Sequence, residues 1–427
     1  MRARPPCAPT RAALLGLAIA ALGAPAAAAA RELWTDGERG ASLRTSLKSA
    51  LVVDDPPDDP LLFPEEESAA SYWRLRFDAE VRPAAWAKLE LAYEQRLRTG
   101  AVAAFVGTGA VVGEVPPPWR IEPLDWEIAS GPSFAWRHEI DRASLTLHLG
   151  RAEVTAGRQA IGWGRGVLFG AVDLFAPFSP LEADREWRRG VDAVRAEVRL
   201  TDRISADGVA AIGESVDTSI FAARLRGYAG EVDAEIVAGW RARDLFAGLT
   251  SSAAVGDAEL HGEFAVFRAP EPLPAGGAWG DPRLAPKAVL GGSYRFAVGR
   301  GLAVFAEYHW SGFGARSPDE LVELLATSAE FRERYLRGDT QILQRQAVSL
   351  LATLELTNEL SGQALALVSP RDGSGVLSPS FTYTLSDAAS VQATLYLPWG
   401  AEPDGLTLQS DYGWMPLSAF IQIRVYD

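Results

Sequence analysis

Apolar and polar residues alternate with a period of two over many segments of the chain. One such segment covers residues 85–96, where Ala85, Ala87, Leu89, Leu91 and Tyr93 alternate with Lys88, Glu90, Glu94 and Arg96. The same alternation returns at 390–397 and at 417–425. Strands of about ten residues with one apolar and one hydrated face are typical of transmembrane β-barrels. Because backbone polar groups in lipid must be paired internally, such strands have to close on themselves. The pattern therefore predicts an all-β fold, a transmembrane antiparallel β-barrel.

Turn-forming residues divide the chain into about eighteen such strands. We expect strands at about 40–52, 70–82, 84–98, 132–149, 151–161, 190–200, 203–214, 217–228, 230–242, 244–254, 257–268, 287–298, 301–310, 344–357, 359–369, 374–386, 388–398 and 414–426. Sixteen strands is the leading alternative, because the alternation is weakest at 40–52 and 244–254.

Tight turns alternate with longer connections along this strand order. The six long connections, which all fall on the same side, are 53–69, 100–131, 162–189, 269–286, 311–343 and 400–413. Barrels of this kind have short periplasmic turns and long extracellular loops. We therefore assign the six long connections to the cell surface.

Residues 1–30 have the pattern of a secretory signal peptide. Three arginines precede the apolar stretch from Ala12 to Leu22, and small residues follow from Ala26 to Ala30. No later stretch has the roughly 18 apolar residues of a membrane helix. We expect cleavage near residue 30, and a single barrel domain over 31–427 in the outer membrane of a Gram-negative cell.

Charge, cysteine usage and the absence of one catalytic motif argue against several classes of function. The formal net charge is −14, which argues against nucleic acid, because phosphates demand basic patches. The one cysteine, Cys7, lies in the predicted signal peptide, so we expect no disulfide, no thiolate metal site and no cysteine nucleophile. We also expect no cofactor. No Gly-x-Ser-x-Gly motif occurs, and we expect no enzyme.

Strand parity places charged side chains of both signs in the barrel lumen. The predicted pore-lining residues are Arg74, Arg76, Glu90, Glu94, Arg224, Arg226, Glu235, Arg241, Glu263 and Glu307. Charge rings select ions only where one sign dominates a cross-section. Because the two signs nearly balance, we expect weak ion selectivity.

The segment 157–192 is the densest in glycine, arginine and aspartate. Residues 157–166 are GRQAIGWGRG, and residues 187–192 are WRRGVD. This stretch resembles an uncharacterised family of Gram-negative outer-membrane barrels that share a GRQ-x-I-x-WG strand end and a GVD strand start. The resemblance covers about residues 141–200, and it is more distant to alginate-export-type and porin-type barrels. It implies a porin-like barrel and leaves the solute open.

We predict that 162–189 folds into the lumen and narrows the pore through one charged network. The apolar residues Leu174, Phe175 and Phe178 would anchor it, and an extracellular loop over the rim is the alternative. Arg158 falls at lipid-facing parity unless a bulge at Gly157 turns it inward. The predicted constriction residues are Arg158, Gln159, Arg165, Asp173, Asp184, Arg185, Arg188, Asp192 and Arg195.

The sequence also suggests roles for two of the long connections and for the histidines. Ser317 to Glu320 form a capping box with proline at the first helical position, so we expect a helix up to about Arg337 that rests on the surface or gates the pore. The acidic run 54–67 could bind Ca²⁺, although its spacing matches no calcium loop. His138, His148, His261 and His309 are scattered over separate strands, so no shared metal site is expected.

These patterns favour a porin-like channel for small solutes. The alternative is an exporter or assembly barrel for a surface polysaccharide or another envelope polymer. The expected partners are outer-membrane lipid and lipopolysaccharide, the barrel assembly machinery, and a small-molecule or oligosaccharide solute.

Overall fold

The computed structural model describes residues 30–63, 68–100 and 116–427. Residues 1–29 of the predicted signal peptide and the acidic residues 65–67 lie outside the described residues. Twenty strands in the described residues form one sheet, and eighteen of them close the barrel. These are β2 (Arg39–Asp55), β3 (Ser68–Ala84), β4 (Ala87–Gly100), β6 (Phe134–Leu149), β7 (Ala152–Gln159), β8 (Val191–Arg199), β9 (Ile204–Ala211), β10 (Ile220–Ala229), β11 (Val232–Arg241), β12 (Asp244–Val255), β13 (Ala258–Arg268), β14 (Leu284–Phe296), β15 (Leu302–Ser311), β16 (Gln346–Glu355), β17 (Leu360–Val368), β18 (Gly375–Ser386), β19 (Ala389–Trp399) and β20 (Leu417–Tyr426).

The barrel closes where its first and last strands meet. β2 and β20 run antiparallel with a continuous register from Ser46 opposite Tyr426 to Asp55 opposite Leu417. Each other strand of the barrel pairs antiparallel with its neighbour in sequence order. The predicted barrel of eighteen strands is confirmed, including the two segments with the weakest alternation.

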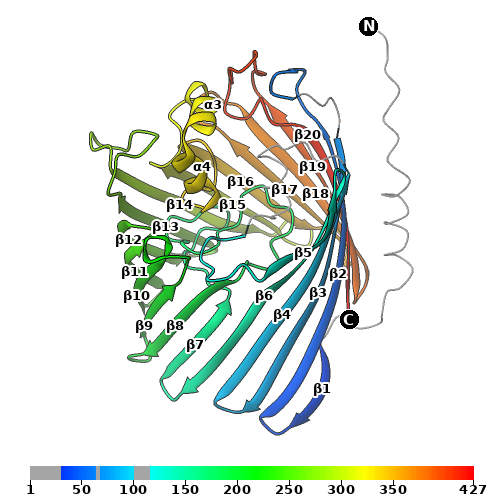
Figure 1. Ribbon diagram of the computed structural model, residues 1–427, viewed down its shortest axis with the longest axis vertical. Coiled ribbons are helices and arrows are strands. Elements are labelled where there is room, and N and C mark those ends of the chain that lie inside the picture. Colours follow the sequence, from blue (N-terminus) through cyan, green and yellow to red (C-terminus); the bar gives the residue numbers. More distant parts are fainter. Residues whose placement is uncertain (1–29, 64–67, 101–115) are drawn as a thin grey trace.

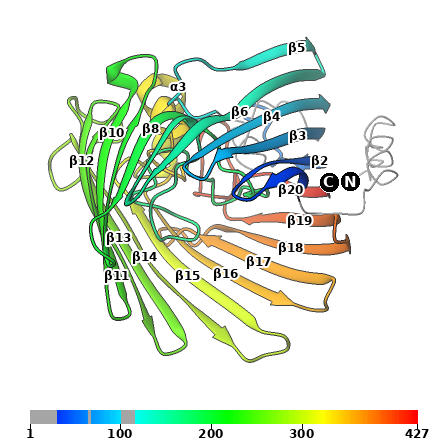
Figure 2. The ribbon, with the colours of Figure 1, turned by 90° about the horizontal axis from the view of Figure 1, so that it is seen from below.

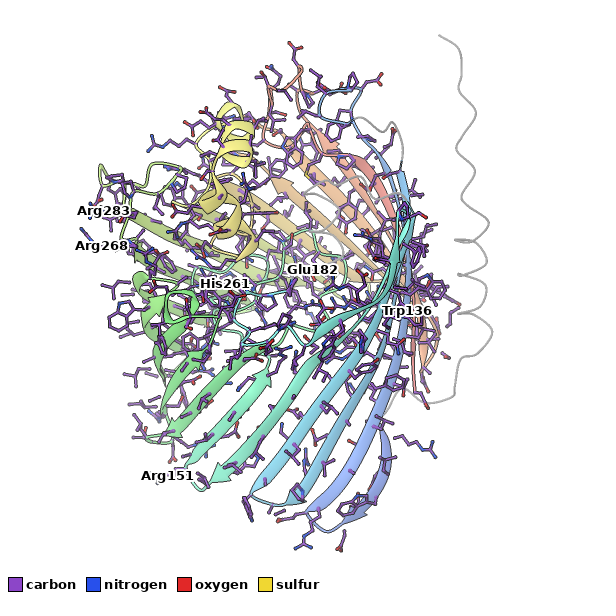
Figure 3. All side chains as sticks on the ribbon, in the orientation of Figure 1. Trp136, Arg151, Glu182, His261, Arg268 and Arg283 are labelled. Atoms are coloured by element: carbon purple, nitrogen blue, oxygen red, sulfur yellow. The ribbon has the colours of Figure 1, made fainter. Side chains whose placement is uncertain are left out.

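Long and short connections lie at opposite ends of the barrel (Figure 1). The tight turns lie at the lower end in this view and the long connections at the upper end. Figure 3 marks the two ends, with Arg151 at a lower turn and Arg268 and Arg283 at the upper rim. The prediction that the long connections share one side is therefore confirmed.

Two short strands were not predicted. β1 (Arg31–Asp36) forms a hairpin with the start of β2, and β5 (Asp125–Gly131) pairs with the start of β6. β5 lies within the stretch that was expected to be only a loop. β7 pairs with β6 only from Ala143 to Leu149, so it does not reach the upper part of β6. β5 takes the place of β7 there and pairs with residues 134–139 of β6.

The outer surface of the barrel is apolar at matching heights on adjacent strands. Leu225, Ile236, Leu249 and Phe264 are register partners on four successive strands, and their exposed fractions lie between 37% and 64%. Apolar side chains are exposed in this way where the barrel contacts lipid. The alternation read from the sequence thus corresponds to a lipid-facing and a lumen-facing side.

The long connection after β15 contains two helices, α3 (Pro318–Thr327) and α4 (Ala329–Leu336). The prediction of one continuous helix was wrong, because Ser328 is extended and its side chain accepts a hydrogen bond from the backbone N–H of Phe331. The expected capping box is also not formed, since Ser317 makes no side-chain cap. A short 3₁₀ turn, Val216–Thr218, precedes β10. No helix in the described residues is long and apolar enough to cross a membrane.

Candidate functional site

The connection between β7 and β8, residues 160–190, lies inside the barrel, and we call it the inward loop. Figure 2 shows it as a teal trace within the ring of strands. Eight of its apolar side chains are buried: Ile161, Trp163, Leu168, Phe169, Ala171, Val172, Leu174 and Phe175. The Trp163 and Phe175 rings meet edge to face at 5.1 Å, and the Phe169 ring stacks on His309 of β15 at 4.6 Å. The loop therefore has a small apolar core of its own.

Glu263 of β13 holds the first part of the inward loop through backbone N–H groups. Its carboxylate accepts hydrogen bonds from the N–H groups of Gly166 (2.8 Å), Ala171 (2.6 Å) and Val172 (3.2 Å), and also from that of Arg165. Gly164 has φ +103°, and a Cβ there would lie 2.7 Å from Glu263 Oε1. The close approach of the loop to this carboxylate thus requires glycine.

Glu307 of β15 holds the next residues in the same way. It accepts hydrogen bonds from the N–H groups of Leu168 (3.0 Å) and Phe169 (3.1 Å), and from that of Val167. His261 Nε2 lies 3.1 Å from the same carboxylate. Glu263 and Glu307, which we call the carboxylate anchors, are only 3% and 2% exposed. Both were predicted to line the pore, and they are buried under the inward loop instead.

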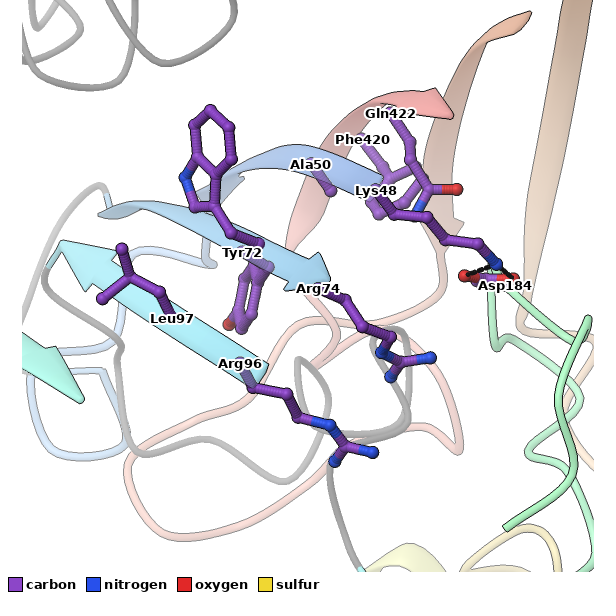
Figure 4. A pocket seen from close by; sticks show the side chains of 10 residues that line it. Lys48, Ala50, Tyr72, Arg74, Arg96, Leu97, Asp184, Phe420 and Gln422 are labelled. Atoms are coloured by element: carbon purple, nitrogen blue, oxygen red, sulfur yellow. Dashed lines mark hydrogen bonds and ion pairs between the residues drawn. The ribbon is translucent and has the colours of Figure 1, made fainter. Parts of the chain in front are cut away.

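A buried lysine holds the far end of the inward loop. Lys48 Nζ of β2 lies 2.6 Å from the Asp184 carboxylate (Figure 4). It also lies 2.7 Å from the Glu186 carboxylate. Burial acts to raise the pKa of Asp184, yet the charge of Lys48 holds this pKa below its usual value. Tyr426 donates a hydrogen bond to Glu186 at 2.6 Å. Lys48 was absent from the predicted site, although it occupies a lumen-facing position of its strand.

The helix-bearing connection covers the inward loop from above. Gln341 accepts a hydrogen bond from Gly170 N–H (2.7 Å) and donates one to Phe178 O (2.9 Å). Arg241 donates a hydrogen bond to Leu174 O (2.8 Å) and forms an ion pair with Asp339. The two connections therefore form one packed unit.

Arg158 does not lie in the pore. Its side chain lies on the outward face of β7, the same face as exposed Ala156. It forms an ion pair at 2.7 Å with Asp192, the residue opposite it on β8. No register shift occurs at Gly157, so the bulge expected there is not formed. The guanidinium is buried because it also donates to the carbonyl oxygens of Glu122, Pro123 and Ile140. It closes the barrel wall above the short strand β7.

The other predicted constriction residues do not all join one network. A chain of ion pairs through Glu235, Arg224 and Asp207 links Arg165 to Arg195, whereas Arg188 pairs separately with Asp173. Arg188 contacts Asp173 at 2.6 Å, Arg165 contacts Asp233 at 2.7 Å, and Arg195 contacts Asp207 at 2.7 Å. Arg185 and Gln159 donate to backbone carbonyl oxygens.

The predicted pore-lining charges all have partners in the described part of the chain. Besides the two carboxylate anchors and Arg241, they pair as Arg74 with Glu94, Arg76 with Asp141, Glu90 with Lys88, Arg224 with Asp207, Arg226 with Asp233, and Glu235 with Arg165. Most of the wall charge is therefore used to hold the wall and the inward loop together.

The histidines stay apart from one another. His138 contacts Tyr93, His148 pairs with Glu153, and His261 lies between Glu259 and Glu307. Among the described residues, no group of three metal-binding side chains occurs.

In the acidic run, the Asp59 carboxylate accepts hydrogen bonds from the N–H groups of Leu61 and Leu62.

A cavity of about 540 Å³ remains between the inward loop and one side of the barrel. Residues 180–186 form its loop side, and β16–β20 form its wall. We call this space the pore cavity. Its wall side chains are mostly uncharged: Leu351, Gln363, Leu365, Ser378, Ser380, Thr382, Gln392, Thr394, Tyr396, Arg424 and Tyr426.

Glu182 lies at the pore cavity, where pH can change its charge (Figure 3). Burial raises the pKa of this carboxyl to about 7, against a hydrogen bond from Ser179 N–H that lowers it. The group is therefore mostly neutral at pH 6 and mostly negative at pH 8. We expect cation preference, measured as a reversal potential across bilayers, to rise between these pH values. Glu182→Gln should lose this rise, whereas Glu402→Gln, at an exposed loop position, should keep it. An equal rise of cation preference in Glu182→Gln would show that Glu182 is not the group that titrates.

The fold is similar to that of several solved structures. OccAB1 of Acinetobacter baumannii matches with a TM-score of 0.54 at 9% identity, over 91% of this chain and 96% of that one. OccAB3 of the same organism gives a TM-score of 0.53 at 9% identity, with coverages of 91% and 99%. OccK11 of Pseudomonas aeruginosa gives 0.51 at 11% identity, with coverages of 90% and 95%. No protein-family model and no curated protein sequence matches the chain. At these identities the likeness shows the barrel fold alone.

Proposed function

We propose that the protein is a channel of the Gram-negative outer membrane through which small solutes pass passively, and that it is not an enzyme. The pore cavity carries this proposal. It lies inside a closed barrel with a lipid-facing exterior, and its walls are polar side chains and an inward loop. An eighteen-stranded barrel is too wide for its own side chains to fill, so a narrowed aqueous path is expected.

The polymer exporter considered from the sequence is not favoured. The inward loop is attached inside the lumen to β13, β15 and β2, and the helix-bearing connection covers the loop from above through Gln341. A cavity of about 540 Å³ has the size of a small-molecule site, since such sites span about 300–1,000 Å³. The barrel exterior also fits insertion by the barrel assembly machinery and contact with lipopolysaccharide.

Purified barrel in planar bilayers should give ohmic conductance with weak ion selectivity. The reason is that charges of both signs are paired on the wall, so neither sign dominates a cross-section of the lumen. Conductance and reversal potential in a salt gradient test this expectation. Folded barrel without any conductance would refute the proposed function, and a strong preference for one ion sign would refute the balance of charge.

A further inference from the structure

The barrel wall is divided into two sectors of different chemistry. From β2 to β15, lumen-facing arginine, glutamate and aspartate side chains pair with one another and with the inward loop. From β16 to β20, the side chains at the pore cavity are hydroxyl, amide, leucine and tyrosine groups, with Arg424 as the single charged residue. We call this second sector the neutral wall. The inward loop rests on the charged sector, so the open space lies against the neutral wall.

The charges that remain at the pore cavity nearly cancel. On the loop side, Asp184 and Glu186 share Lys48, and at pH 8, where Glu182 is mostly ionised, Glu182 and Arg185 carry opposite charges. On the wall side, the Arg424 guanidinium donates to the amide oxygens of its neighbours Gln392 and Gln422 and forms no ion pair with a described residue. Burying an ion without a counter-charge is expensive. With Glu182 ionised, the three carboxylates and the three cations Lys48, Arg185 and Arg424 sum to zero, so a charged solute gains no net attraction here to offset its loss of water.

The neutral wall does offer hydrogen bonds to an uncharged solute. Ser380 and Thr394 hydroxyls lie 2.8 Å apart, and Gln392 donates to both. The side chains of Gln363 and Thr382 also line the cavity, and neither forms a side-chain hydrogen bond with the described part of the chain. They remain free to exchange water for a solute hydroxyl.

Apolar side chains stand on both sides of these polar groups. Leu351 and Leu365 lie on the neutral wall, and Leu168, Pro180 and Leu181 lie on the inward loop. A sugar ring presents hydroxyl groups at its edge and C–H groups on its faces. This combination fits a cavity of about 540 Å³ with hydroxyl, amide and leucine side chains.

We infer that the pore cavity is a binding site for uncharged, hydroxyl-rich solutes of the size of a mono- or disaccharide, and that the neutral wall is their path. The inference rests on the proposed channel function and adds the class of solute to it. Gln363 and Thr382 are the side chains that would bind the solute hydroxyls.

The test is block of the ion current by three sugars with the same ring: glucose, glucuronate and glucosamine. Glucose should reduce the current of the wild-type channel in a saturable way, and the two charged sugars should need a several-fold higher concentration. Combining Gln363→Leu with Thr382→Val removes two hydrogen-bonding groups, so the half-blocking glucose concentration should rise roughly fivefold or more. Each single variant should show part of this rise.

Thr250→Val is the matched control, because the Thr250 hydroxyl is buried on β12 with no hydrogen-bond partner in the described residues and does not line the cavity. It should bind glucose as the wild type does. Equal or stronger block by glucuronate or glucosamine would overturn the inference, as would unchanged glucose block in the double variant. A channel that conducts without sugar block would also overturn the inference and leave the channel function standing. A folded barrel without conductance would refute both.

Discussion

Replacing both carboxylate anchors, as Glu263→Gln with Glu307→Gln, should release the inward loop and raise single-channel conductance. Together the two carboxylates accept hydrogen bonds from seven backbone N–H groups of the loop. An amide offers one acceptor oxygen and turns a competing N–H donor toward this row of donors. A buried donor left without its partner costs about 1–3 kcal/mol. Losing only two of these seven hydrogen bonds would shift the equilibrium between the seated and the released loop toward release by about tenfold or more, because about 1.4 kcal/mol corresponds to a factor of ten.

Single-channel recording and liposome swelling with sugars larger than a disaccharide measure this release. Glu90→Gln is the control, because Glu90 pairs with Lys88 on the wall and has no bond to the inward loop. Deleting 172–183 should raise conductance in the same direction by removing part of the loop itself. Unchanged conductance and size limit in a folded double variant would show that the loop does not narrow the pore.

Removing residues 423–427 should abolish barrel assembly, which is the largest loss expected for a short deletion. These residues pair with β2 from Ser49 back to Ser46, and Asp427 exchanges two backbone hydrogen bonds with Thr45. Without them the closing ladder is open along half of its length, and unpaired backbone groups in lipid cost several kcal/mol each. Deleting Asp427 alone should be tolerated, because its bonds lie at the end of the ladder, where water can replace them.

Heat-modifiable mobility of the folded barrel on gels is the measurement for both deletions. A normal folded band from the deletion of 423–427 would show that β2 and β20 do not close the barrel. Loss of the band on removal of Asp427 alone would show that the end of the ladder contributes more than expected.

The strands could be predicted because lipid and lumen impose a strict alternation on every residue. β13 was expected at 257–268 and is found at Ala258–Arg268, since the turn Gly256-Asp257 sets its start. β5 could not be predicted, because its seven residues are too few to show alternation and it forms only where β7 stops. The parity of Arg158 was read correctly. Its burial was missed, because the carbonyl oxygens that cover it belong to a segment about 35 residues earlier.

The inward loop could be located from its mixed charge and its apolar residues, but its attachment could not. Glu263 and Glu307 bind backbone N–H groups, which every residue except proline carries and which leave no mark in the sequence. Gln341 is a similar case, since a single neutral side chain in a long connection gives no signal of its partner. Lys48 could have been found, because a lysine at a lumen-facing position of a predicted strand needs a carboxylate partner if it is buried.

The contacts that anchor the segment between β7 and β8 join residues that are far apart in the sequence. Val167 and its acceptor Glu307 are 140 residues apart, and Tyr396 bonds to Leu181 across 215 residues. The segment between β7 and β8 therefore takes its final position only when β13, β15 and β19 are in place around it. Because these strands belong to different parts of the wall, occupation of the interior and closure of the wall depend on one another.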